Sequence, residues 1–190
     1  MARILAFAGS TRKESFNKKL VKAAADCARE AGGEVTLVDL RDYPMPIYDG
    51  DLEEARGVPE NAMKLNRLVS EHHGLLLACP EYNSSITVVL KNTIDWVSRP
   101  REKKPLLATF TGKVAALLSA SPGELGGLRG LVHVRSILAN IGVIVVPNQI
   151  SVPKAFDAFA DDGSLKDDKL QGKVAALASD LVETTRKIHG

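Results

Sequence analysis

Cysteine is scarce in this 190-residue chain, which contains only Cys27 and Cys79. Their separation matches no metal-ligand spacing, and two cysteines are too few for a disulfide-stapled scaffold. Disulfide-poor chains are typical of reducing compartments. The N-terminal residues MARILAFAGSTRK contain a short apolar run without the cleavage pattern of a secretory signal. We therefore expect a cytoplasmic protein.

Long apolar runs and an excess of one charge are also missing. No stretch approaches the roughly 18 consecutive apolar residues that indicate a membrane-spanning helix. The formal net charge is +2, and the basic residues form no stripe of the kind that follows a nucleic-acid backbone. The expected partner is therefore a small molecule, with no nucleic acid and no membrane.

The sequence lacks the motifs of several enzyme classes. It has neither the Gly-Lys-Ser/Thr ending of a nucleotide-binding P-loop nor the GxGxxG fingerprint of dinucleotide-binding domains. It has no convincing Ser-His-Asp arrangement and no cluster with metal-ligand spacing. The histidines stand at a helix end, on a helix or near the terminus: His72, His73, His133 and His189. We expect no metal and no catalytic side chain.

The chain does contain a regular alternation of short apolar runs with helical patterns. The apolar runs are residues 3–9, 34–40, 74–79, 113–120 and 142–146. Apolar side chains recur at helical spacing in segments ending at residue 32 and over residues 60–72, 87–97, about 125–140 and 170–181. This alternation predicts a parallel sheet covered by helices on both faces, in a single domain of residues 1–190. Residues 43–59, with three prolines, are expected to form a loop, and residues 147–169 an irregular connection.

The turn after the first predicted strand, GSTRKESFN (residues 9–17), joins a buried strand to a helix start. In parallel sheets, ligands bind beyond the carboxyl ends of the strands. Free N–H groups and the dipole at a helix N-terminus favour an anion. The hydroxyls of Ser10, Thr11 and Ser15 and the guanidinium of Arg12 add donors for phosphate oxygens. The turn is a candidate phosphate site; the alternative is a polar turn with Ser15 as an ordinary helix N-cap.

Two further turns meet the same edge of the predicted sheet. CPEYNSS (residues 79–85) offers the flat face of Tyr82 and the N–H groups near Asn83 and Ser84 to a flat heterocycle. SASPGELGG (residues 119–127) contains three glycines, which permit close approach of backbone to ligand. The alternatives are a turn with an exposed aromatic side chain and a flexible turn.

Together these segments resemble the NADPH-dependent FMN reductase family, the flavodoxin-like group that includes bacterial quinone, azo-dye and chromate reductases. The matching motifs are GSTRKESFN, PEYNSS followed by LKNTIDWVSRP, and SASPGELGG, in the family's order. The resemblance implies an α/β flavodoxin-like three-layer sandwich with parallel strand order 2-1-3-4-5, assembled as a homodimer or homotetramer. It implies an enzyme that binds FMN, takes a hydride from NADPH or NADH, and passes electrons to a quinone, azo compound, metal ion or flavin.

The resemblance also implies which residues bind the cofactor. Those expected to hold the FMN phosphate are Ser10, Arg12, Ser15, Phe16 and Asn17. Those expected to border the isoalloxazine are Pro80, Glu81, Tyr82, Asn83 and Ser84. Those expected close to the flavin or the nicotinamide are Ser119, Ser121 and Gly123. In such proteins the flavin performs the chemistry, and the protein supplies position and electrostatics.

One stretch departs from the family pattern. Residues 86–89 read Ile-Thr-Val-Val where the family often has a proline followed by small residues. Thr87 can still cap the next helix, whereas Val88 and Val89 are bulkier than glycine. This departure supports one alternative, a flavin-free sensor of the same fold; the other is a flavodoxin-type electron carrier, although such carriers are commonly acidic. The basic residues after the helix are interpreted as a solvated loop, with contacts to the 2′-phosphate of NADPH as the alternative: Arg99, Arg101, Lys103 and Lys104.

Overall fold

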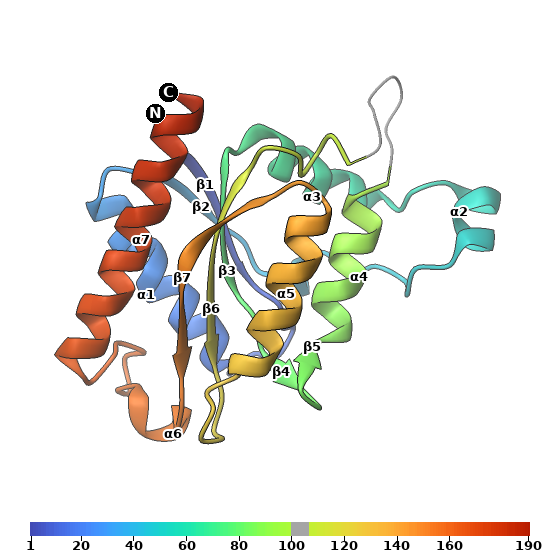
Figure 1. Cartoon of the computed structure of the whole chain (residues 1–190). Coiled ribbons are helices and arrows are strands. Elements are labelled where there is room, and N and C mark those ends of the chain that lie inside the picture. Colours follow the sequence, from blue (N-terminus) through green and yellow to red (C-terminus); the bar gives the residue numbers. More distant parts are fainter. Residues whose placement is uncertain (100–106) are drawn as a thin grey trace.

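A parallel sheet forms the centre of the molecule in the computed structural model, which describes residues 1–99 and 107–190 (Figure 1). Within these residues the sheet has five strands in the order β2-β1-β3-β6-β7. Their bounds are β1 Arg3–Ala8, β2 Glu34–Leu37, β3 Gly74–Ala78, β6 Val114–Ala120 and β7 Ile144–Val152. The expected order 2-1-3-4-5 is confirmed, because β6 and β7 are the fourth and fifth strands of this sheet along the chain.

Helices cover both faces of the sheet and produce three layers (Figure 1). One face carries α1 (Phe16–Glu30) and α7 (Asp168–His189), which pack against each other and the sheet. The other face carries α3 (Glu60–Glu71), α4 (Val88–Val97) and α5 (Leu128–Asn140). The carboxyl ends of β6 and β7 point to the lower edge in Figure 1, and both chain termini lie at the opposite edge.

The apolar strand runs are explained by burial on both sides. Side chains alternate along a strand, so Ile4 and Ala6 of β1 pack toward α1 and α7, whereas Leu5 and Phe7 pack toward α3, α4 and α5. All five residues of β3 are buried. A strand covered on both faces has no polar side and reads as a continuous apolar run, which is why the sequence pattern located it correctly.

Two predicted irregular segments contain regular structure. The predicted loop of residues 43–59, referred to below as the arm, contains α2 (Gly50–Arg56), whose first turn is capped by Asp49 accepting from the N–H of Asp51 at 2.9 Å. None of the residues of α2, all of which the structure describes, is buried. The helix therefore has no apolar face, and apolar periodicity could not reveal it.

The last strand is longer than the expected 142–146 and extends to Val152. Pro147 interrupts the apolar run, and the register against β6 shifts between the pairs Ala115–Val145 and Leu117–Gln149. A proline lacks the N–H of a sheet ladder and is tolerated at an edge strand or an irregularity. Pairing resumes after it, so part of the predicted irregular connection is strand, followed by the short α6 (Ala155–Ala158).

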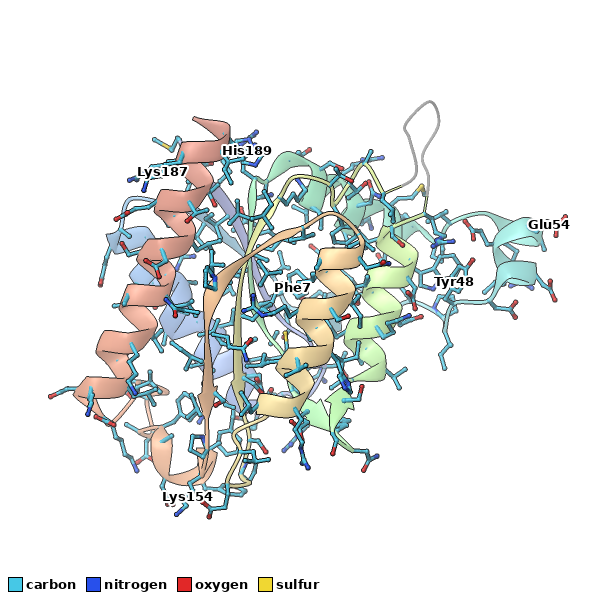
Figure 2. All side chains as sticks on the ribbon, viewed as in Figure 1. Phe7, Tyr48, Glu54, Lys154, Lys187 and His189 are labelled. Atoms are coloured by element: carbon cyan, nitrogen blue, oxygen red, sulfur yellow. The ribbon has the colours of Figure 1, made fainter. Side chains whose placement is uncertain are left out.

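A group of basic side chains holds the C-terminal helix at the amino-terminal edge of the sheet. The rings of His73 and His189 stack with centroids 5.0 Å apart and 9° between planes. The Nη2 of Arg3 lies 3.2 Å from Nε2 of His73. Burial, then Arg3, His189, Lys113 and the amino terminus, hold the pKa of His73 below its usual value. Figure 2 shows His189 near the end of α7.

We expect acid to destabilise the fold through His73. Because the pKa of His73 is lower in the folded state, the unfolded state binds the proton more readily below about pH 6.5. The melting temperature should therefore fall as pH decreases through this window and fall less steeply in His73→Gln. The same substitution at exposed His133 is the control, and parallel melting curves for His73→Gln and wild type would contradict the expectation.

Candidate functional site

A pocket opens where the turns after β1, β3 and β6 meet. Its lining residues are Ser10, Arg12, Ser15, Phe16, Asn17, Pro80, Glu81, Tyr82, Ala120, Ser121 and Pro122. Nine of the expected site residues are among them, and the structure adds Ala120 and Pro122. Asn83, Ser84, Ser119 and Gly123 do not line this pocket.

The end of the pocket formed by α1 is suited to an anion. Ser15 occupies the N-cap position in an extended conformation, yet among the described residues its side chain makes no capping hydrogen bond. Ser10 and Ser15 are both 5% exposed, and the hydroxyl of Ser10 accepts from the N–H of Arg12 at 3.2 Å. The first turn of α1 contains no acidic residue. Hydroxyls, a guanidinium and free helix N–H groups therefore meet here, and the first turn of α1 adds no carboxylate to them.

Asn17 locks this end of the pocket to β6. Its buried amide donates to the carbonyl of Ala120 at 2.8 Å and accepts from the N–H of Ala120 at 3.0 Å. The amide group is thus held in place by one donated and one accepted hydrogen bond. The backbone N–H of Asn17 lies in the first turn of α1, where N–H groups have no intrahelical partner.

Thr87 links the first turn to α4. Its hydroxyl donates to the carbonyl of Gly9 at 2.7 Å and accepts from the N–H of Leu90 at 3.1 Å. Gly9 is required for this approach, because a Cβ there would lie 2.9 Å from Cβ of Leu90. Thr87 therefore caps α4, as expected, within the stretch that departs from the family pattern, and Val88 beside it is exposed.

The turn after β3 is a small hairpin rather than a loop. It consists of β4 (Glu81–Tyr82) and β5 (Ser85–Ile86), with Asn83 and Ser84 at its tip. Both tip residues have positive φ, 50° and 64°, as a two-residue type I′ turn requires. Asn83 and Ser84 consequently shape the hairpin, while Tyr82, 53% exposed, presents an aromatic ring at the pocket.

Glu81 connects this hairpin to the start of α5. One carboxylate oxygen lies 2.8 Å from Nη2 of Arg129, and the other accepts from the N–H of Gly130 at 2.9 Å. Burial alone would raise the pKa of Glu81, but the hydrogen bonds from Gly130 and Arg129 and the charge of Arg129 hold it below its usual value. The Glu81 side chain therefore remains a carboxylate at neutral pH.

The turn after β6 supplies backbone and covers Ser119. Ser119 is fully buried, and among the described residues its hydroxyl has no hydrogen-bond partner. Gly127, with φ 88°, lies directly over it, since a Cβ there would be 1.9 Å from the Ser119 oxygen. The N–H of Gly123 donates to the hydroxyl of Ser121 at 3.2 Å, which orders the turn beside the pocket.

Other candidate groups lie apart from this chemistry. Burial raises the pKa of the Cys79 thiol, so this cysteine stays protonated. Arg99 binds the arm, with its guanidinium 5.0 Å from the ring centroid of Tyr48, and Arg101, Lys103 and Lys104 lie outside the described residues. Within residues 1–99 and 107–190, no three His, Cys, Asp or Glu side chains gather to hold a metal. None of the described helices has the length and apolar character to cross a lipid bilayer.

The fold is that of a flavodoxin-like α/β protein, and the pocket lies where the turns after three of its parallel strands meet. The family model described as NADPH-dependent FMN reductase matches residues 2–157. An NAD(P)H-dependent FMN reductase of Pseudomonas aeruginosa is 32% identical over 99% of this chain and 97% of its own. An NAD(P)H:quinone oxidoreductase of Solanum tuberosum is 32% identical over 99% of this chain and 95% of its own.

A solved structure agrees with these relatives. A flavoenzyme NAD(P)H:(acceptor) oxidoreductase of Paracoccus denitrificans superposes with a TM-score of 0.79 and 29% identity, covering 97% of this chain and 99% of that one. The chain belongs to the NADPH-dependent FMN reductase family and is an oxidoreductase.

We expect the amide of Asn17 to stabilise the fold measurably. Asn17→Leu leaves the buried N–H and carbonyl of Ala120 unpaired and should lower the unfolding free energy by about 2 kcal/mol. Urea denaturation measures this change. Asn148→Leu, at an exposed asparagine of β7, is the matched control and should change stability by less than about 0.5 kcal/mol. If both substitutions lowered the unfolding free energy equally, the Asn17–Ala120 hydrogen bonds would stabilise the fold no more than an exposed asparagine does.

Proposed function

We propose that this chain is an NAD(P)H-dependent FMN reductase whose cofactor occupies the pocket between the turns after β1, β3 and β6. The observation that carries the proposal is the pairing, in one pocket, of a helix start rich in donors with an edge formed by Pro80, Tyr82 and Pro122. FMN has the same two ends, a phosphate and a flat ring. Bound there, FMN would accept a hydride from NADPH or NADH and pass electrons to a quinone, azo compound, metal ion or flavin.

The residues divide between the two ends. At the phosphate end, the Ser10 and Ser15 hydroxyls and the Arg12 guanidinium would donate, together with the backbone N–H groups of Phe16 and Asn17. The Phe16 ring stacks on Phe159, with centroids 5.9 Å apart, which holds the start of α1 against the core. At the ring end, Pro80, Glu81 and Tyr82 would border the flavin, with Asn83 and Ser84 holding the hairpin in shape. Ser121 and Gly123 would form the wall near the flavin or nicotinamide. Ser119 would support this wall from its buried side.

Two observations weigh against the alternatives. The flavin-free sensor was supported by the altered stretch at residues 86–89, yet Thr87 caps α4 and binds the carbonyl of Gly9 beside the pocket. The flavodoxin-type carrier would be expected to be acidic, whereas the net charge here is +2. Oxidation of NAD(P)H by the isolated protein separates the reductase from the carrier.

We also propose that the protein is cytoplasmic and works as a homodimer or homotetramer. Both cysteines are buried free thiols, which suits a reducing compartment. The arm stands clear of the three layers, with Tyr48 near its base and Glu54 on its outer part (Figure 2). A helix of seven residues is marginal by itself, so α2 would gain stability from cover by a second copy. Ile47, 74% exposed, offers apolar surface on the same segment.

The cofactor site is tested with purified protein, FMN and riboflavin. Wild type should bind FMN and show flavin absorption bands that bleach when NADPH, or NADH, is added without oxygen. Arg12→Ala should weaken FMN binding by about tenfold or more, because a charge-assisted hydrogen bond to phosphate is lost. The variant should bind riboflavin, which has no phosphate, as wild type does.

Lys13→Ala in the same turn is the control, since Lys13 does not line the pocket. Wild-type protein that takes up no FMN would refute the proposed function. Bleaching by neither nicotinamide would favour the carrier.

The assembly is tested by light scattering coupled to gel filtration. Wild type should elute with at least twice the chain mass of 20.4 kDa. Ile47→Asp should shift the mass toward the monomer, because it introduces charge into the exposed apolar part of the arm. Ile188→Asp near the end of α7 is the control for an exposed isoleucine elsewhere. A monomeric wild type would exclude the proposed assembly.

A further inference from the structure

The ring end of the pocket contains a charged side chain, Glu81, whose charge has no part in the proposed function. Glu81 lines the pocket, and its side chain is 8% exposed. A buried carboxylate beside an anionic ligand is unfavourable unless its charge is balanced. The partner that balances it is Arg129, whose side chain is 57% exposed on the first turn of α5.

The contact between Glu81 and α5 uses both carboxylate oxygens. Arg129 donates from Nε at 3.0 Å and approaches through Nη2 at 2.8 Å, both to the same oxygen. The N–H of Gly130 donates to the other oxygen at 2.9 Å. The residue preceding α5 is Gly127, which has no side chain to cap the helix. The acceptor is supplied instead by Glu81 of the β4–β5 hairpin.

Gly130 makes this approach possible. A Cβ at position 130 would lie 3.3 Å from Cβ of Glu81 and 3.3 Å from the carbonyl oxygen of Ser85. The hairpin therefore packs directly against the backbone of α5. A second link joins them, since Nδ1 of His133 lies 2.9 Å from the hydroxyl of Ser85. Strands of two residues each are not stable alone, so these contacts determine where Tyr82 lies.

The same contact determines the charge that a bound ring experiences. Two-electron reduction of a flavin takes up two electrons and one proton and leaves the ring with one additional negative charge. An unbalanced carboxylate on the pocket wall would disfavour that state, and the guanidinium of Arg129 offsets it.

We propose that Arg129 is a positioning residue that sets the reduction potential of the bound flavin by pairing with Glu81 and holding the β4–β5 hairpin on α5. The proposal rests on the proposed function, namely that FMN occupies this pocket. It assigns Arg129 no contact with the substrate. Arg129 acts on the flavin by balancing the charge of Glu81 and by fixing the position of the hairpin.

The test measures midpoint potentials of the FMN-bound protein by equilibration with a reference dye. In Arg129→Gln, unpaired Glu81 should weaken binding of reduced relative to oxidised FMN by about tenfold, the order expected for one charge through a high effective dielectric. For a two-electron couple this lowers the potential by about 30 mV. Glu81→Gln should raise the potential, because the guanidinium is then unbalanced. The double variant should return close to wild type, and Arg129→Lys should retain most of the wild-type potential.

The controls separate charge from structure. Arg135→Gln removes the same charge from the same helix at a residue that binds β7 carbonyls, and should leave the potential unchanged. The effect of Arg129→Gln should decrease at high salt, because Arg129 is exposed. A purely structural role would instead shift the potential in the same direction in both single variants, or weaken oxidised and reduced FMN equally. Either result would overturn the proposal.

Failure of the proposed function has a different signature. If wild type binds no FMN, both the function and the role of Arg129 are refuted. If FMN binds and NADPH reduces it while the potentials of the four variants equal that of wild type, the function stands and the role of Arg129 is refuted. Opposite shifts in the two single variants, cancelled in the double variant, support the proposal.

Discussion

The pocket depends on the pair of hydrogen bonds between the buried amide of Asn17 and the backbone of Ala120. The turns after β1 and β6 are more than 100 residues apart in sequence. Each carries polar backbone groups that must find a partner once they are removed from water. The amide satisfies a donor and an acceptor of Ala120 together, so it fixes the position of one turn relative to the other. The first turn of α1 is thereby fixed against the wall formed by Ser121 and Pro122.

The other two links extend this arrangement around the pocket. Thr87 joins the end of β1 to the start of α4, and Glu81 joins the hairpin to the start of α5. Each link combines a strand exit with a helix N-terminus, where backbone N–H groups have no intrahelical partner. The N–H groups at the starts of α4 and α5 need acceptors, and the side chains that supply them hold the pocket walls together. At α1, the side chain of Ser15 makes no such bond among the described residues, so this helix start has no side-chain cap.

This division gives the pocket two ends of different chemistry. The α1 end offers hydroxyls, N–H groups and Arg12 without an acidic residue in its first turn. The hairpin end offers aromatic and proline surface together with a carboxylate neutralised by Arg129. A flavin enzyme needs this contrast, because its cofactor carries a permanent phosphate charge at one end and a changing charge at the other. The protein determines position and electrostatics, and the cofactor performs the electron transfer.

The sheet was predictable because burial on both faces leaves a signal in the sequence. The buried strands β1, β3 and β6 read as apolar runs. In α3 and α7, apolar residues recur at helical spacing because each helix buries one face. The helix α2 gave no such signal because it has no buried residue, and β7 was shortened in prediction because Pro147 interrupts its apolar run. A local apolar pattern in the sequence indicates burial. Such a pattern does not reveal an exposed helix, as in α2, or strand pairing that continues past an irregularity, as in β7.

By itself, the sequence determined the kind of fold and the residue types that follow the buried strands at one edge of the sheet. Position beyond a buried strand and before a helix was sufficient for this, as the turn containing Ser10, Arg12 and Ser15 illustrates. The tertiary structure alone decided the partners of these residues. Asn17 pairs with Ala120 and Glu81 with α5, because buried polar groups take complementary groups that are near in space. That choice depends on how distant segments pack, which short-range sequence patterns do not encode.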